Sequence, residues 1–219
     1  MGVRGSRPIR LLLMVGVALL LIVEYVVDPG APTLPELGTL PAFQLTDEHG
    51  GAYGREALVD KVTIVDFVFT SCTSACPLLT AQMARLQDDL RGGALGDGVR
   101  LLSISVDPAR DTVERLGAYA REHGADPQLW RFVRGDEVPL RHVVVDGMKQ
   151  VMDRQPDKGE VDGFTILHGT RLMLVDGLAR MRGFYDANDA TDLERLRHDA
   201  RLLASTRRGR GAGRGCGRR

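Results

Sequence analysis

The sequence predicts an α/β domain with the architecture of a three-layer sandwich, preceded by a single N-terminal transmembrane helix. Three observations favour this architecture. Short apolar, β-branched runs of strand length alternate with segments of helical periodicity. Two further apolar runs, separated by a glycine turn, predict a hairpin, and a last helical segment follows it. An unbroken apolar run lies ahead of all these elements, close to the N-terminus.

The N-terminal region divides into three parts by composition. A basic flank, residues 1–10, precedes the apolar run of residues 11–27, and a linker with four prolines, residues 28–41, follows. The apolar run is either a signal peptide or a membrane anchor. No small-residue cleavage site follows it cleanly, which favours an uncleaved anchor. The arginines of the flank would then place the rest of the chain on the far side of the membrane.

Residues 42–205 contain the elements of the predicted domain. The first half begins with a short strand from Phe43 that turns back at Gly50–Gly51, followed by strand Val62–Phe69, a helix ending near Arg91, strand Val99–Val106 and helix Thr112–His123. The second half contains strand Trp130–Val133, helix Val138–Met152 and the polar loop Asp153–Gly163. The hairpin strands Thr170–Val175 and Leu178–Tyr185 come next, and the last element is a helix with Asp189 as N-cap that ends near Leu203. This order is that of a thioredoxin-like α/β sandwich. Residues 206–219 are rich in arginine and glycine and predict a disordered tail.

Charge and cysteine content exclude several classes of protein. The chain has 29 basic and 29 acidic residues, but three basic and two acidic ones lie in the first thirty residues and six basic ones lie from Arg207 onward. The part between therefore holds 20 basic and 27 acidic residues, a balance that does not suit a nucleic-acid-binding domain. Three cysteines are too few for a disulfide-stapled scaffold or for a four-cysteine zinc site.

Two of the cysteines, Cys72 and Cys76, lie between the strand Val62–Phe69 and the helix that follows it. A helix N-terminus favours thiolate over thiol, because its unpaired N–H groups and dipole attract negative charge. Three residues separate the two sulfurs, one more than in a CxxC redox motif, so both could face one soft metal ion or form a disulfide. The plainer alternative is a pair of buried, inert cysteines.

Of the five histidines, His168 is the best candidate for a third ligand, because it lies at the start of the hairpin expected beside the cysteine-bearing strand. A Cys₂His set could hold Cu(I) or Cu(II). Taken alone, such a histidine is more often a surface or capping residue. Asp66 lies inside the central strand, where a carboxylate is unusual. The Asp66 carboxylate could assist proton transfer from a thiol, or it could face a polar edge.

Five segments in order, FQLTDEHG, VDFVFTSCTSACP, ISVDPARDT, LWRFVRGD and the later His168, resemble the Sco/SenC family of membrane-anchored, thioredoxin-fold copper proteins of cytochrome c oxidase assembly. The resemblance implies that Cys72, Cys76 and His168 are copper ligands. It also implies that Asp107 and Asp111 shape a loop near the site, with Asp111 able to cap the following helix. The chain departs from the family pattern at Thr73 and Leu167, where many members have proline and aspartate.

The resemblance implies a metallochaperone, not an enzyme, that delivers copper to the binuclear copper site of cytochrome c oxidase. Its partners would be the copper-bearing oxidase subunit and other copper chaperones or thiol reductases. The chain would cross the inner membrane once, with its domain on the periplasmic side. The alternative is an anchored thiol–disulfide oxidoreductase that reduces the cysteines of the oxidase copper site and does not need His168. A thiol peroxidase and a purely structural domain are weaker interpretations.

Overall fold

The computed structural model describes residues 34–71, 76–150, 152–154, 164–166 and 170–212. Residues from Pro35 onward form one compact unit, separate from Met1–Leu34. The predicted anchor, residues 11–27, lies outside the described residues. Within the described ranges, no helix combines the length and the apolar character needed to cross a membrane.

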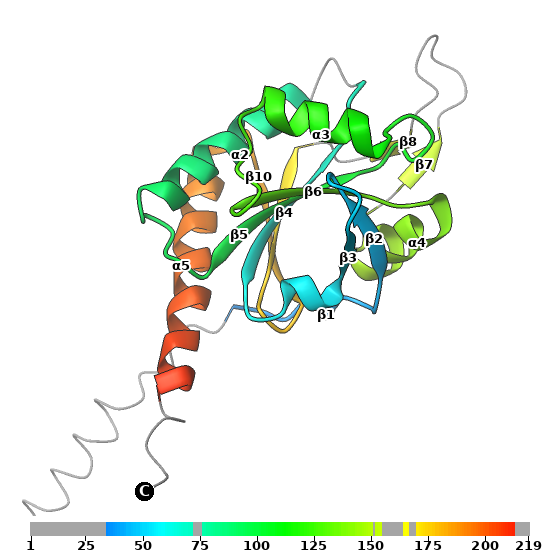
Figure 1. Ribbon diagram of the computed structural model, residues 1–219. Coiled ribbons are helices and arrows are strands. Elements are labelled where there is room, and N and C mark those ends of the chain that lie inside the picture. Colours follow the sequence, from blue (N-terminus) through cyan, green and yellow to red (C-terminus); the bar gives the residue numbers. More distant parts are fainter. Residues whose placement is uncertain (1–33, 72–75, 151, 155–163, 167–169, 213–219) are drawn as a thin grey trace, which may run out of the picture. The chain divides into compact units, whose positions relative to one another are not determined.

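An eight-stranded mixed sheet forms the centre of the domain, with the strand order β1-β10-β9-β4-β5-β6-β2-β3 (Figure 1). Its strands are β1 (Gly38–Thr39), β2 (Gln44–Asp47), β3 (Ala52–Gly54), β4 (Val62–Val68), β5 (Val99–Ser105), β6 (Trp130–Arg134), β9 (Arg171–Val175) and β10 (Arg180–Asp186). A separate hairpin pairs β7 (Met152–Arg154) with β8 (Phe164–Ile166). The helices are η1 (Arg55–Leu58), α2 (Cys76–Arg91), α3 (Val113–Glu122), α4 (Glu137–Arg141), the π-helical η2 (His142–Gly147) and α5 (Ala190–Ala212).

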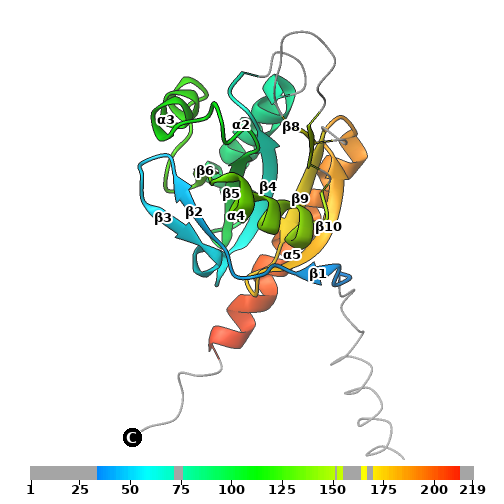
Figure 2. The ribbon, with the colours of Figure 1, turned by 90° about the vertical axis from the view of Figure 1, so that its right-hand side faces the viewer.

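β4 lies at the centre of the sheet, and all seven of its residues are buried. It pairs in parallel with β5 and antiparallel with β9. Because side chains alternate between the faces of a strand, β4 contributes to two cores. Val65 and Phe67 pack in the cluster that includes Leu140 and Val144 of α4 and η2. The opposite face is covered by α2 and α5 (Figures 1 and 2). The predicted α/β sandwich is therefore confirmed.

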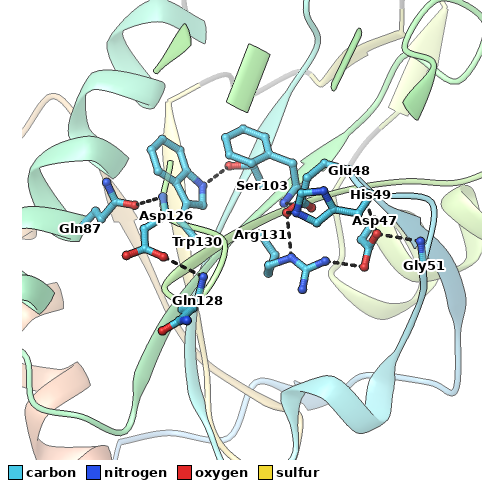
Figure 3. A network of polar contacts seen from close by, with 11 residues as sticks. Asp47, Glu48, His49, Gly51, Gln87, Ser103, Asp126, Gln128, Trp130 and Arg131 are labelled. Atoms are coloured by element: carbon cyan, nitrogen blue, oxygen red, sulfur yellow. Dashed lines mark hydrogen bonds and ion pairs between the residues drawn. The ribbon is translucent and has the colours of Figure 1, made fainter. Parts of the chain in front are cut away.

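The edge hairpin β2–β3 is attached to β6 by a buried ion-pair network (Figure 3). The Arg131 guanidinium donates from Nε to Glu48 Oε1 at 2.8 Å and also contacts the Asp47 carboxylate. The other carboxylate oxygen of Glu48 accepts from the Phe132 N–H at 3.0 Å. Since Glu48 is buried, both of its oxygens need these donors.

Several predicted boundaries differ from the structure. The predicted linker contains β1, which pairs with Arg180 and Met181 of β10. The helix predicted over Val138–Met152 ends early: α4 widens into η2, which ends at Gly147, and Met152 begins β7. At the C-terminus, α5 continues to Ala212 instead of ending near Leu203; the alanines and arginines of this stretch are strong helix formers.

Two predicted helix starts agree with the structure. Thr112 caps α3, since its hydroxyl accepts from the Arg115 N–H at 3.3 Å. Asp189 caps α5, since its carboxylate accepts from the N–H of Thr191 at 2.7 Å. Both are the residue types whose short side chains satisfy the free amides of a first turn.

Candidate metal and redox site

The predicted site lies where β4 ends and α2 begins. Cys76 is the first residue of α2, and Pro77 follows in the first turn, where the missing N–H costs no helical hydrogen bond. Cys72 and His168 lie outside the described residues. The backbone nevertheless places Cys76 at a helix N-terminus, the position that favours a thiolate.

The register of the sheet relates the two segments that carry the predicted ligands. β9 runs antiparallel to β4, with Thr63 opposite Val175 and Val65 opposite Met173. Continued in this register, Arg171 at the start of β9 lies level with Phe67 near the end of β4. β9 therefore begins at the edge of the sheet at which β4 ends. Figures 1 and 2 show the end of β4 and the start of α2 at this edge.

Asp111 holds the chain where it leaves β4. Its carboxylate accepts from the Thr70 N–H at 3.2 Å to each oxygen and from the Thr70 hydroxyl at 2.5 Å. The Ser105 hydroxyl at the end of β5 donates to the same carboxylate at 2.5 Å. Asp111 is fully buried, so this set of donors offsets the cost of its desolvation. The group thereby fixes the start of the cysteine segment against the neighbouring strand.

The predicted helix-capping role of Asp111 is wrong, because the hydroxyl of Thr112 caps α3 and Asp111 points to Thr70 instead. The structure thus shows what the residues of the DPARDT segment do: they form a tight turn after β5. Backbone N–H groups of Arg110 and Asp111 donate to the Asp107 carbonyl, which closes a tight turn. That turn delivers Asp111 back to the end of β5.

Asp107 is buried beside this turn, with its N–H 3.3 Å from the Ser105 hydroxyl oxygen. Burial raises the pKa of the Asp107 carboxyl, while the Arg110 guanidinium opposes that shift. The Arg110 nitrogen lies 3.8 Å from the carboxylate, which is an ion-pair distance but too long for a hydrogen bond. Asp107 therefore contributes charge and turn geometry next to the site.

Asp66 ends a buried chain of polar groups on the β4 face covered by α2. The Ser103 hydroxyl donates to Asp66 Oδ1 at 2.5 Å, and the Trp130 indole N–H donates to the same hydroxyl oxygen at 2.9 Å (Figure 3 shows the Trp130–Ser103 bond). Among the described residues, the second Asp66 oxygen has no hydrogen-bond partner. Burial raises the pKa of Asp66 to about 7, although the Ser103 hydrogen bond acts to lower it. Burial thus favours the protonated form of Asp66, which lies inside the sheet and not at a polar edge.

Sequence reasoning missed Thr70, Ser105, Ser103 and Trp130. For three of these residues the partner lies far away in the chain: 41 positions separate Thr70 from Asp111, 37 separate Asp66 from Ser103, and 27 separate Trp130 from Ser103. One signal was available, since serines alternate with apolar residues at positions 103 and 105 of an otherwise buried strand. A serine pair on one face of such a strand indicates buried polar partners.

A mixed sheet with helices on both faces, whose central strand is followed by a helix that begins at Cys76, is the architecture of the thioredoxin-like class of proteins. Residues 33–203 match the SCO1/SenC protein family. The match covers most of the chain and the whole of the sheet, so the chain belongs to the SCO1/SenC family.

Solved structures of this family share the fold. A SCO1/SenC family lipoprotein from Bacillus anthracis is 29% identical, with a TM-score of 0.69, and the alignment covers 78% of this chain and 99% of that one. BsSco, a Sco-family cytochrome c oxidase assembly protein with a disulfide switch, is 23% identical with a TM-score of 0.67 over 80% of this chain and 99% of that one. Copper-bound ScoI of Bradyrhizobium japonicum is 25% identical with a TM-score of 0.58 over 76% and 99%.

Proposed function

We propose that this protein is a copper metallochaperone that acts in cytochrome c oxidase assembly, with Cys72, Cys76 and His168 as copper ligands. The observation that supports the proposal is the β4–β9 register, because the start of β9, which His168 precedes in the sequence, lies at the edge where β4 ends, and Cys72 follows β4 in the sequence. Family membership supports the choice of metal, since the Bradyrhizobium japonicum relative is a copper-bound protein. Two thiolates and an imidazole are ligands suited to both copper oxidation states.

The proposed role follows from how the ligands are supported. The start of α2 favours the thiolate form of Cys76, so copper can bind without a costly deprotonation. Asp111 fixes the start of the cysteine segment at Thr70, which limits the motion of one ligand-bearing end. Three ligands from two segments also suit transfer, because an acceptor such as the copper-bearing oxidase subunit can replace them one at a time.

The alternative function is a thiol–disulfide oxidoreductase that reduces the cysteines of a partner before the partner binds copper. Two observations favour keeping it. The relative BsSco carries a disulfide switch. In this chain, a buried carboxyl with a pKa of about 7, Asp66, lies on the strand that leads into the cysteine pair. This function needs Cys72 and Cys76 but does not need His168.

The proposal includes a membrane anchor formed by residues 11–27, with the domain on the extracytoplasmic side. The arginines that precede this run support that orientation. A family relative from Bacillus anthracis is a lipoprotein, which places that protein at a membrane. Alkaline carbonate extraction of membranes holding the full chain tests the anchor: an anchored chain stays in the pellet, and a cleaved, released chain appears in the soluble fraction.

A Cu(I) competition titration tests the ligand set. The reduced, anaerobic protein would be titrated against a chromophoric chelator of known affinity, together with the Cys72→Ser, Cys76→Ser and His168→Ala variants. Each variant should lose more than about 100-fold in affinity, because removing a residue that only orients a ligand already costs 10- to 100-fold.

Two matched controls accompany these variants. Cys216→Ser removes a thiol from the C-terminal tail, and His142→Ala removes an exposed imidazole that contacts Asp146 at 3.1 Å. Both should bind copper like the parent. If His168→Ala also binds copper like the parent while its dithiol oxidises normally, the ligand set is wrong and the oxidoreductase is favoured.

A further inference from the structure

β6 carries two arginines whose side chains lie on opposite faces of the sheet. Arg131 and Arg134 are three positions apart, and successive side chains of a strand alternate between its two faces. Arg131 contacts Asp47 and Glu48 of the edge hairpin, as Figure 3 shows. Arg134 is the last residue of β6 and lies on the other face, so its partners are different.

Arg134 contacts the tight turn that follows β5, the neighbouring strand. Its guanidinium Nη2 donates to the Pro108 carbonyl at 3.0 Å. Pro108 lies inside the turn that the N–H groups of Arg110 and Asp111 close on the Asp107 carbonyl. A hydrogen bond from a charged guanidinium is stronger than one between neutral groups. Arg134 therefore holds this turn from the adjacent strand.

The charge of Arg134 also acts on the first turn of α3. The pKa of the Glu114 carboxyl is lowered, first by a hydrogen bond with the Thr112 side chain and in part by the positive charge of Arg134. Pro108 lies three residues before Asp111, and Glu114 lies three residues after it. Arg134 thus interacts with the chain on both sides of Asp111.

Asp111, between these two points, is the buried group that contacts the chain leaving β4. Its carboxylate accepts from the Thr70 N–H at 3.2 Å and from the Thr70 hydroxyl at 2.5 Å. Thr70 lies two residues before Cys72 in the sequence. Hydrogen bonds weaken steeply when their length or angle departs from the optimum. A shift of the turn would therefore loosen the hold of Asp111 on Thr70.

Arg134 makes its contacts at a cost to the stability of the fold. Its Nε atom is buried and has no hydrogen-bond partner among the described residues. A buried donor without a partner is destabilising, and such a group in a native structure requires an explanation. Arg131, on the same strand, instead donates from Nε to Glu48 at 2.8 Å. This difference indicates that Arg134 serves a purpose other than fold stability.

From these contacts we infer that Arg134 is a positioning residue, which holds the turn Asp107–Asp111 so that the Asp111 carboxylate stays directed at Thr70. The consequence for copper rests on the proposed function: if Cys72 is a ligand, the same contacts slow the release of copper. Loss of a group that only orients a ligand lowers metal affinity by roughly 10- to 100-fold. Arg134 acts through one further residue, so its effect should be smaller.

Hydrogen exchange at the Thr70 amide tests this role without copper. NMR would follow the reduced, metal-free full chain in detergent micelles, with the Val106 amide, which donates to the Val68 carbonyl at 2.9 Å, as reference. Arg134→Met should speed Thr70 exchange relative to Val106 at least about fivefold, because the turn opens locally. Arg134→Lys keeps a donor and the charge, so it should stay within about twofold of the parent. Arg131→Met, the matched control on the same strand, should leave the ratio unchanged.

A double-mutant cycle on copper release tests the route through Asp111. In stopped-flow transfer to a chelator, Arg134→Met should release copper at least about threefold faster than the parent. In an Asp111→Ala background, the same change should have no further effect, because residues that act through one another are not additive. Arg131→Met should release copper like the parent.

Three outcomes would overturn the role of Arg134. The first is a Thr70-to-Val106 exchange ratio in Arg134→Met that equals the parent's. The second is an equal rise of this ratio in Arg131→Met, since a general loss of stability would then explain it. The third is the full acceleration of copper release retained in the Asp111→Ala background. A parent that binds no copper tightly would count against the proposed function alone, and the exchange ratio would still decide the role of Arg134.

Discussion

Replacing Asp66 by asparagine should make the protein more stable at neutral and alkaline pH. Asp66 is fully buried, and one of its oxygens has no hydrogen-bond partner among the described residues. Asparagine can still accept the Ser103 hydrogen bond, and it carries no charge. It therefore resembles the protonated form of the aspartate and removes the cost of burying a carboxylate.

The magnitude follows from the pKa of Asp66, which burial raises from 3.8 to about 7. The shift of about three units corresponds to about 4 kcal/mol at 1.36 kcal/mol per unit. The sign follows from the raised value. Below pH 4 Asp66 is protonated in both the folded and the unfolded state, so its ionisation does not lower the free energy of unfolding. Between pH 4 and pH 7 the unfolded chain releases this proton first, so the stability of the parent falls relative to the variant. Above pH 7 the difference is constant.

Urea unfolding of the reduced, metal-free protein between pH 4 and pH 9 measures this difference. Trp130 is the only tryptophan of the chain and is fully buried, so its fluorescence reports unfolding. Subtracting the parent curve from the Asp66→Asn curve cancels the titration of the cysteines and other groups. Asp88→Asn, a change at a side chain that is 74% exposed, serves as control. Parent and Asp66→Asn curves that stay parallel over this pH range would refute the buried-proton interpretation.

Two further substitutions distinguish a residue that supports the cysteine segment from a residue that supports the fold away from it. Asp111→Ala should destabilise the domain by about 3 kcal/mol, because the buried Ser105 donor and the half-buried Thr70 donors lose a charged partner. It should also speed copper loss to a chelator in stopped-flow, and unchanged kinetics would argue against its support of the cysteine segment. Arg131→Met should cost about 3–5 kcal/mol, since Glu48 stays buried without its ion-pair partner. The copper affinity of the Arg131→Met variant should equal that of the parent. A loss of copper affinity in this variant would contradict the interpretation that Arg131 supports the fold and not the metal site.

The parts of the fold that could be predicted were those set by local sequence. β4 is a continuous apolar run, and α3 and α5 begin at residues whose side chains cap them. Their boundaries depend on neighbours in the chain. The position of Cys76 at the start of α2 was predictable for the same reason, because Pro77 favours a first turn.

The parts that could not be predicted depend on contacts between distant segments. β1 is two residues long and exists because β10 offers it a partner. Asp111 has the sequence position of a helix cap, but its buried carboxylate binds Thr70, 41 positions away, which only the pairing of β4 with β5 brings near. The raised pKa of Asp66 likewise depends on its burial, which only the neighbouring strands and α2 of the assembled domain provide.

We propose that copper binds to two sulfurs and one imidazole, those of Cys72, Cys76 and His168. X-ray absorption at the copper edge of the Cu(I)-loaded protein measures this ligand set directly. The account predicts two sulfur scatterers and one nitrogen scatterer in the parent, with the nitrogen lost in His168→Ala and retained in His142→Ala. A spectrum of sulfur scatterers alone in the parent, or an unchanged nitrogen contribution in His168→Ala, would contradict it.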